Sequence, residues 1–202
     1  MSNSLRVKRF SGRGVEQHVP GLASLRIRVF RDFPYLYDGS EEYEKKYLQT
    51  YTDSPESVIV IVLDGDRIVG ASTGIPLAHE TPEVQRPFVE NGYVIDEVFY
   101  CGESVLLDEY RGRGLGVRFF EEREAHARAL GRFRHIGFCA VQRPVDHPRR
   151  PAGYVPLDSF WEKRGYHKQP QLQTTFTWRD LDETEPSAKK MMFWMKKLEN
   201  NR

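Results

Sequence analysis

The feature that most constrains this chain is a glycine-rich turn between an apolar strand and a long helical segment. Residues 103–120 read Glu-Ser-Val-Leu-Leu-Asp-Glu-Tyr-Arg-Gly-Arg-Gly-Leu-Gly-Val-Arg-Phe-Phe. Glycines let the backbone approach an anion closely, and the N-terminus of a helix exposes free N–H groups with a partial positive charge. The segment therefore predicts a phosphate-binding cradle in a protein of the α/β class.

The residues of the turn separate this cradle from two familiar phosphate-binding motifs. A P-loop would need Gly-Lys-Ser/Thr at the end of the turn, where this chain has Val117 and Arg118. A dinucleotide fingerprint starting at Gly112 would need a glycine in place of Val117, and it would lie near the start of a βαβ unit. The pattern that does fit is Arg-x-x-Gly-x-Gly, at Arg111, Gly114 and Gly116.

Composition excludes several classes of protein. With 202 residues, a net charge of +1 and 39% hydrophobic residues, the chain is neither disordered nor a strongly basic nucleic-acid binder. No apolar run approaches the ~20 residues of a membrane span, and residues 1–10 lack the apolar core of a secretory signal. Cys101 and Cys139 are too few for a disulfide framework. We therefore expect a single cytoplasmic domain over residues 1–202.

The near-zero net charge hides an uneven distribution along the chain. Residues 38–64 carry seven acidic residues against two lysines, whereas residues 111–150 carry ten arginines against four acidic residues. Solvated helix faces explain most of these charges. A cleft that takes an anion on one side and a cation on the other would use the same split.

Hydrophobic periodicity and turn residues predict the elements. We expect seven strands, at residues 5–10, 57–63, 67–76, 99–107, 135–141, 172–178 and 190–195. Four main helices are expected at residues 22–33, 40–51, 114–130 and 156–164, with a further short one near 83–90. The four prolines of residues 142–156 predict a loop there.

Two motifs and the order of these elements resemble the GNAT acetyltransferase superfamily. The family motif is Arg/Gln-x-x-Gly-x-Gly/Ala after an apolar strand, and residues 105–116 fit it. The family often shows an aromatic-aromatic-Glu-Lys-x-Gly-aromatic signature further on, and this chain has Phe160-Trp-Glu-Lys-Arg-Gly-Tyr166. The resemblance covers roughly residues 5–198. It implies an α/β (α+β) GNAT fold, with a mixed, mostly antiparallel sheet of about seven strands, splayed at the cofactor site, and about four flanking helices.

The resemblance also implies a cofactor site for acetyl-CoA as acyl donor. The pyrophosphate would lie on the backbone N–H groups of residues 111–116, and the pantetheine arm would pair with the preceding strand. That strand would be splayed from the strand that starts near His135. The implied cofactor-binding residues are Val105, Leu106, Leu107, Arg111, Gly112, Arg113, Gly114, Leu115, Gly116 and Trp161.

A catalytic base and an acid follow from the chemistry of amine acetylation. A free alkylamine is mostly protonated at neutral pH, so a group must take its proton. Family members often carry an acid where this chain has Glu103, which is either that base or a salt-bridged residue at the end of a strand. The family's tyrosine acid corresponds to Trp161, and indole is not an acid in this range. Tyr154 or Tyr166 then substitutes, or CoA leaves as the thiolate.

Long connections predict where the acceptor binds. The link after the first helix offers the aromatic residues Phe33, Tyr35 and Tyr37 to an amine-bearing molecule. In the loop at 142–156, four basic residues could receive a carboxylate or phosphate of the acceptor, bind the cofactor's 3′-phosphate, or simply be solvated: Arg143, His147, Arg149 and Arg150.

Three functions remain open from the sequence. The first is an acetyl-CoA-dependent N-acetyltransferase acting on a small-molecule or protein amine. The second is a non-catalytic acyl-CoA-binding or regulatory module, and the third is a transferase that uses a longer acyl-CoA. We expect no metal, nucleic-acid or membrane partner; the last strand, near Met191 to Met195, could serve a homodimer.

Overall fold

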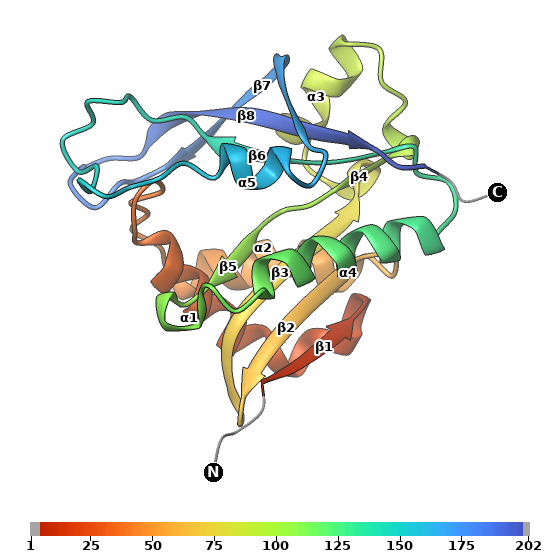
Figure 1. The fold of residues 1–202 in the computed structure, drawn as a ribbon, viewed down its shortest axis with the longest axis horizontal. Coiled ribbons are helices and arrows are strands. Elements are labelled where there is room, and N and C mark those ends of the chain that lie inside the picture. Colours follow the sequence, from red (N-terminus) through yellow and green to blue (C-terminus); the bar gives the residue numbers. More distant parts are fainter. Residues whose placement is uncertain (1–4, 200–202) are drawn as a thin grey trace.

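The structure, a computed structural model, describes residues 5–199 and has an eight-stranded mixed sheet at its centre (Figure 1). The strands run in the order β1-β2-β3-β4-β6-β8-β7, and β5 pairs with β3 beside this path. All pairs are antiparallel except β4 with β6. The strands are β1 (Arg6–Phe10), β2 (Val58–Asp64), β3 (Arg67–Pro76), β4 (Val98–Tyr100), β5 (Ser104–Leu106), β6 (His135–Val141), β7 (His167–Trp178) and β8 (Ser187–Lys197).

Helices cover both faces of the sheet. In Figure 1, α4 crosses in front of β2 and β3, while α1 and α2 lie behind them. The helices are α1 (Val19–Phe30), α2 (Glu41–Asp53), α3 (Pro82–Glu90), α4 (Leu115–Ala129) and α5 (Asp158–Glu162). The predicted fold class is confirmed, with eight strands and five α-helices in the described chain where about seven and four were expected.

Local sequence explains where the central elements begin and end. All residues of β2 except the last are buried, and most are β-branched, which suits a strand covered on both faces. At the start of α2, the Ser40 side chain accepts a hydrogen bond from the Tyr43 N–H over 3.3 Å. The motif helix α4 follows Gly114, at φ +78°, and is closed by Gly131, at φ +77°.

The expected single strand at 99–107 is wrong, because the chain changes partners within it. β4 runs parallel to β6, and the last bond to that strand is from the Cys101 N–H to the Gly137 carbonyl, at 2.8 Å. β5 instead runs antiparallel to β3, where the Thr73 N–H donates to the Glu103 carbonyl over 3.0 Å. Gly102 lies between the two segments. Local sequence cannot reveal such a change, because the partners of β4 and β5 lie far away along the chain.

The first helix and the last two strands also differ from expectation. α1 spans Val19–Phe30 rather than 22–33, and Phe33 lies in the turn that follows, because a residue before proline disfavours the helical region. A cis peptide joins Phe33 to Pro34. β7 and β8 each extend beyond the ranges 172–178 and 190–195; the added residues of β7 are mostly polar and exposed, so hydrophobicity did not mark them.

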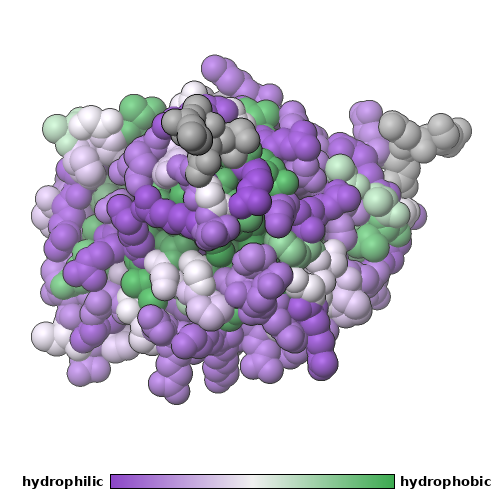
Figure 2. All heavy atoms as spheres, turned by 90° about the horizontal axis from the view of Figure 1, so that it is seen from below, coloured by the Kyte–Doolittle hydropathy of each residue, from purple (hydrophilic) through white to green (hydrophobic). Residues whose placement is uncertain are grey.

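The surface is rich in charge, as the composition requires. The face seen from below Figure 1 is largely hydrophilic, with smaller hydrophobic areas between the charged side chains (Figure 2). No helix in residues 5–199 has both the length and the apolar character needed to cross a membrane.

Candidate functional site

A gap in the sheet opens where β5 turns away from β6. Past the bond between Cys101 and Gly137, β5 pairs with β3 on one side, and no other strand of residues 5–199 pairs with its outer edge. β6 pairs with β4 only through residues 135–137, so residues 138–141 have β8 as their single neighbour. The backbone groups of Val105 and Leu106 therefore lie beside an open edge. An extended, amide-bearing ligand can pair with such an edge like an added strand.

The glycine-rich turn follows β5 along the chain and lies at the C-terminal end of its open edge. Gly112 has φ +73° and Gly114 has φ +78°, and apart from their chain neighbours no atom of residues 5–199 lies within 4 Å of a methyl group placed on either. Gly114 is the N-cap of α4 and supplies no side-chain cap, so the first N–H groups of the helix are free to bind an anion. The Tyr110 hydroxyl donates to Asp64 Oδ2 over 2.7 Å, which ties the turn to the end of β2.

The two arginines of the turn are exposed and held by weak local contacts. Arg111 forms an ion pair with Asp108 at 2.7 Å. Arg113 Nη2 donates to the Glu109 carbonyl over 2.9 Å, and its guanidinium lies 5.2 Å from the centre of the Tyr110 ring. Exposed pairs of this kind contribute little to stability. Both cations can therefore turn to a bound phosphate at small cost.

Glu103 lies directly after the point where the gap begins. It is 8% exposed, and its Oε2 accepts from the Tyr47 hydroxyl over 2.7 Å and pairs with Arg26 Nη1 over 2.6 Å. Arg26 also binds Glu44 through its Nε and lies over the Tyr47 ring, 3.9 Å from its centre. The salt bridge expected as one alternative is present. Glu103 Oε1 takes part in no hydrogen bond within the described chain, so one oxygen remains for another partner.

Three residues that sequence reasoning missed extend the surroundings of Glu103. The Tyr47 and Tyr51 hydroxyls are 2.9 Å apart, and the Tyr51 hydroxyl is 3.2 Å from Glu80 Oε1. Burial raises the pKa of Glu80 to about 7, although hydrogen bonds from the Thr81 N–H and Tyr51 oppose the shift. The Tyr-x-x-x-Tyr spacing on α2 was a signal for one helix face, but nothing local connects it to Glu80.

The aromatic residues after α1 pack against the loop at 142–156. These two segments, residues 31–37 and 142–156, are where the sequence predicts the acceptor, and we call them the acceptor side. The Phe33 ring meets the Tyr154 ring edge-on at 4.7 Å, which brings this link against the loop at 142–156. Tyr35 stacks on Trp178 at 6.0 Å, and burial raises the pKa of its hydroxyl. The pKa of Tyr37 is raised as well, by burial first and then by Glu44. The structure thus brings Phe33 together with Tyr154, and places Tyr37 toward α2.

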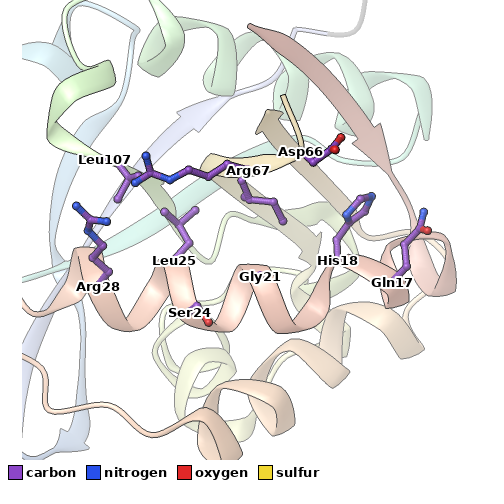
Figure 3. A pocket seen from close by; sticks show the side chains of 10 residues that line it. Gln17, His18, Gly21, Ser24, Leu25, Arg28, Asp66, Arg67 and Leu107 are labelled. Carbon is purple, nitrogen blue, oxygen red and sulfur yellow. The ribbon is translucent and has the colours of Figure 1, made fainter. Parts of the chain in front are cut away.

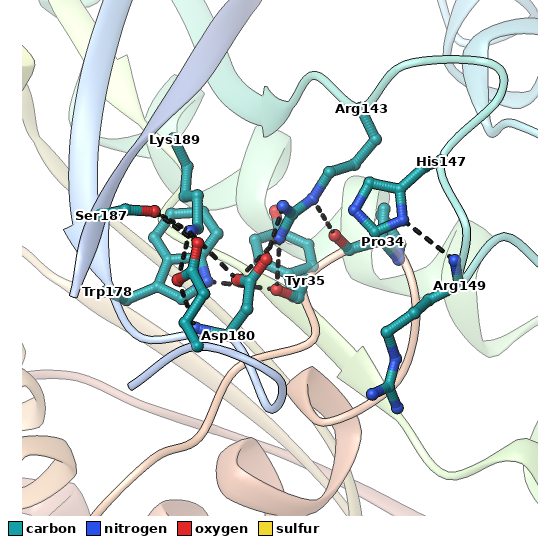
Figure 4. Close-up of polar contacts among 10 residues, drawn as sticks. Pro34, Tyr35, Arg143, His147, Arg149, Trp178, Asp180, Ser187 and Lys189 are labelled. Atoms are coloured by element: carbon teal, nitrogen blue, oxygen red, sulfur yellow. Dashed lines mark hydrogen bonds and ion pairs between the residues drawn. The ribbon is translucent and has the colours of Figure 1, made fainter. Parts of the chain in front are cut away.

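Arg143 corrects one expectation about the basic loop. Its guanidinium forms two bonds to Asp180, at 2.7 and 2.9 Å, and donates to the Pro34 and Tyr35 carbonyls at 2.7 and 2.8 Å (Figure 4). Lys189 lies 3.5 Å from the same Asp180 carboxylate. These bonds occupy four of the five N–H groups of Arg143 and its side chain is 9% exposed, so it is not available to an acceptor. Instead it joins the loop after β6 to the link after α1 and to the turn before β8.

The remaining basic residues of that loop stay accessible. Arg149 is exposed, and its N–H donates to His147 Nδ1 over 3.2 Å. The Arg150 guanidinium lies 4.9 Å from the centre of the Tyr154 ring. No acidic side chain in the described part of the chain pairs with Arg149 or Arg150. Their charges are therefore free for an anionic group.

The candidate acids near the gap have different surroundings. Trp161, on α5, packs edge-on against Phe138 of β6 at 5.1 Å and against Trp194 at 5.0 Å. Tyr166 is fully buried, and its hydroxyl donates to Glu124 over 3.2 Å. Tyr154 is half-exposed, and burial raises its pKa. Of the two tyrosines, Tyr154 is thus the one that faces the loops of the acceptor side.

A separate cavity of about 440 Å³ lies between α1 and the start of β3. Arg28 and Arg67 point into it beside Leu107, and His18 lines its other end (Figure 3). Arg67 also pairs with Glu109 at 3.4 Å, just before the glycine-rich turn. The cavity therefore brings the basic side chains of Arg28 and Arg67 close to Leu107, just after β5. Neither arginine has a role predicted from the sequence.

Comparison with known proteins agrees with these features. The model of the family described as Acetyltransferase (GNAT) matches residues 24–166. Among curated proteins, none matches the sequence. Among solved structures, ribosomal-protein-alanine N-acetyltransferase from Brucella melitensis is 12% identical, with a TM-score of 0.62 and coverage of 96% of this chain and 99% of that one. The yncA protein of Salmonella typhimurium, solved with its cofactor acetyl-CoA, is 7% identical, with a TM-score of 0.59 and coverage of 98% and 96%. At such identities the likeness shows the fold alone.

Proposed function

Because the chain belongs to the GNAT acetyltransferase family, we propose that it is an N-acetyltransferase that moves the acetyl group of acetyl-CoA to a primary amine. Transfer occurs by direct attack of the amine while both substrates are bound. The observation that carries the proposal is the gap between β5 and β6, which leads to the open turn at Gly112 and Gly114.

The chain's own groups fit the two polar parts of acetyl-CoA. The open edge of β5, at Val105 to Leu107, suits the amides of the pantetheine arm. The N-terminus of α4 suits the pyrophosphate, and Arg111 and Arg113 add two positive charges there. When bound, acetyl-CoA supplies an activated acetyl group as a thioester.

Glu103 is the residue we assign to proton removal. In the balanced reaction, the amine nitrogen forms a bond to the acetyl carbon and the carbon–sulfur bond breaks. An ammonium acceptor loses two protons on becoming an amide; Glu103 takes one, and the leaving thiolate or the solvent takes the other. Glu103 Oε1 is the free oxygen at the start of the gap, while Arg26 and Tyr47 hold Oε2 in place. A base must reach the proton directly or through one water, and this oxygen is positioned to do so.

The thiolate leaves either without a protein acid or with a proton from Tyr154. Trp161 carries only an N–H donor and cannot act as an acid near neutral pH. Its edge-on contacts with Phe138 and Trp194 suit packing beside the gap. Tyr154 is the hydroxyl on the acceptor side that remains.

The acceptor is proposed to carry an anionic group as well as its amine. Arg149 and Arg150 offer accessible positive charge beside Phe33 and Tyr154, and Tyr35 and Tyr37 complete the aromatic side. Substitution of both arginines by glutamine is expected to raise KM for such an acceptor and to leave KM for acetyl-CoA unchanged. If KM for acetyl-CoA rises instead, the arginines bind the cofactor's 3′-phosphate; if neither changes, they are only solvated.

One observation favours a second candidate, a non-catalytic acyl-CoA-binding module: indole stands at the position of the family's usual acid, Trp161. Release of the CoA thiol across a panel of amines separates the two. An N-acetyltransferase releases thiol with at least one amine, loses most of that rate as Glu103→Gln, and keeps it in the exposed control Glu42→Gln. Tight acetyl-CoA binding without release for any amine would establish the module. Thermal shifts with longer acyl-CoAs test the chain length that the gap accepts.

A further inference from the structure

Two tyrosine hydroxyls connect the carboxylates of Glu103 and Glu80 in a continuous chain of hydrogen bonds. Glu103 Oε2 is 2.7 Å from the Tyr47 hydroxyl, which is 2.9 Å from the Tyr51 hydroxyl, which is 3.2 Å from Glu80 Oε1. Tyr51 is fully buried, and Glu103 is 8% exposed. The chain runs from the start of the gap, through α2, to the half-exposed Glu80 after β3.

The three contacts between these four groups need one more hydrogen than the two hydroxyls supply. Each of the three contacts joins two oxygen atoms and requires one hydrogen between them. Tyr47 and Tyr51 carry one hydrogen each. With both carboxylates ionised, each hydroxyl would donate to its own carboxylate, and the contact between Tyr47 and Tyr51 would have none. One of the two carboxyl groups must therefore be protonated for the chain to be complete.

The surroundings place that proton on Glu80. Arg26 is 2.6 Å from Glu103 Oε2 and favours its ionised form, whereas no cationic side chain in the described chain pairs with Glu80. The hydrogen-bonding and charged groups nearest to Glu80 are Tyr51 and Tyr43 on α2, the Thr81 N–H, and Glu103 and Arg26 beyond. Tyr100 of β4 and Cys139 of β6 face the same carboxylate. Burial raises the pKa of Glu80 to about 7, in agreement with this assignment.

We propose that Glu80 and Glu103 share one proton through the hydroxyls of Tyr51 and Tyr47, and that Glu80 is a positioning residue that sets the proton affinity of Glu103. The catalytic use of this sharing rests on the proposed function, but the sharing itself does not. In one form the Glu80 carboxyl donates to Tyr51, Tyr51 donates to Tyr47, and Tyr47 donates to the Glu103 carboxylate. In the other form all three hydrogens have moved one place, and Glu103 is protonated.

In this arrangement, the charge of Glu80 affects how readily Glu103 accepts the proton that the amine loses. With Glu80 protonated, Glu103 is a carboxylate that accepts a hydrogen bond from Tyr47 and forms an ion pair with Arg26. When Glu80 loses its proton to solvent, the added negative charge raises the affinity of Glu103 for the proton that the acceptor must lose. At the spacing of this chain, that effect is about three- to tenfold in the rate of proton acceptance.

Carbon-13 NMR of glutamate labelled at its side-chain carboxyl carbon tests the sharing without any substrate. In the wild type, the titration step of Glu80 near neutral pH is expected to appear in the carboxyl signal of Glu103 as well, because the hydrogens between the two groups move together. Tyr51→Phe should remove that step from Glu103, whereas Tyr43→Phe, on an exposed part of the same helix, should keep it. A step that persists at Glu103 in Tyr51→Phe, or its absence in the wild type, overturns the proposal.

Glu80→Gln provides a second test that does not depend on the phenylalanine variant folding. The amide donates to Tyr51 as the protonated acid does, so the chain stays complete while its titration is lost. The Glu103 step near neutral pH should disappear from the NMR titration. With a competent amine, the variant should match the wild type at pH 6 and fall about three- to tenfold below it at pH 8.5.

The rate measurements and the NMR titrations test the proposed function and the shared proton separately. An equal loss of rate at all pH values in Glu80→Gln would mean a structural role and would overturn the positioning role. If no amine is acetylated, the proposed function fails, while the NMR titrations still decide whether the proton is shared.

Discussion

Replacing Gly102 by alanine should disturb the side chains that pack against this glycine. Gly102 lies between β4 and β5, where the chain changes partners. A methyl group built there would lie 1.9 Å from the Tyr51 hydroxyl oxygen, 2.7 Å from that of Tyr47 and 2.9 Å from Thr73 Oγ1. All three distances are shorter than atoms tolerate, so the three side chains must move for Gly102→Ala to fold.

The burial of Tyr51 determines how much stability Gly102→Ala should lose. Tyr51 is fully buried on α2, so its ring cannot swing into solvent to make room. Extra methyl groups in packed regions cost about 1–3 kcal/mol, and the loss of a hydrogen bond in the tyrosine chain adds about 1 kcal/mol. We expect a loss of about 2–4 kcal/mol in the free energy of unfolding, or a Tm lowered by about 4–16 °C for a chain of this length.

Urea unfolding followed by circular dichroism measures this loss. Gly14→Ala is the matched control, because no atom lies within 4 Å of a methyl group at that position, and its stability should change by less than about 0.5 kcal/mol. Tyr51→Phe removes the oxygen nearest to the new methyl group. Gly102→Ala should therefore cost less in the Tyr51→Phe background than in the wild type, a coupling that a double-mutant cycle measures.

Two results would refute this reasoning. A stability of Gly102→Ala within about 0.5 kcal/mol of the wild type would mean that the tyrosine hydroxyls do not pack against this glycine. An equal loss in both backgrounds would mean that the clash lies elsewhere. The thermal shift caused by acetyl-CoA should persist in the variant, because the glycine-rich turn is a separate part of the site.

Three further predictions follow from other parts of the molecule. Gly114→Ala introduces a side chain at φ +78°, a conformation that costs about 1–2 kcal/mol, so calorimetry should show acetyl-CoA binding about tenfold more weakly. Asp180→Asn leaves the buried Arg143 and Lys189 with one carboxylate fewer and should lower stability to urea by about 3 kcal/mol. The Asp180 N–H and then Lys189 lower the pKa of Glu183 to about 2, so this carboxylate stabilises the fold fully above its unfolded pKa of about 4.3 and loses the effect as pH falls toward 2. The stability difference between wild type and Glu183→Gln, measured by urea unfolding, should be constant from about pH 7 to 5 and shrink below about pH 4.5.

Local sequence was sufficient to predict much of the fold and the glycine-rich turn. The strands Arg67–Pro76 and His135–Val141 have the bounds that apolar runs and turn residues predicted. The turn at Arg111 to Gly116 was predictable because its conformation depends on glycines within six residues. In each case the residues that decide the structure are neighbours in the sequence.

The parts that sequence reasoning missed depend on partners far along the chain. Whether residues 99–107 form one strand or two depends on which strands lie on either side, and those are separated from it in sequence. The partners of Glu103 come from α1 and α2, so only the folded chain shows that Arg26 and Tyr47 hold it. For Arg143 the long basic loop left three roles open, namely an acceptor anion, the cofactor's 3′-phosphate or solvent, but Asp180, on a distant turn, binds it.

The cluster around Arg143 has a consequence for how the chain folds. Its bonds reach the Pro34 carbonyl, 109 positions away, and Asp180, 37 positions away. Contacts that close long stretches of chain bear a large entropic penalty and form late. We therefore expect the loops on the acceptor side to become ordered only after both halves of the sheet are in place. Substitutions in this cluster should therefore act on the unfolding rate and leave the folding rate nearly unchanged.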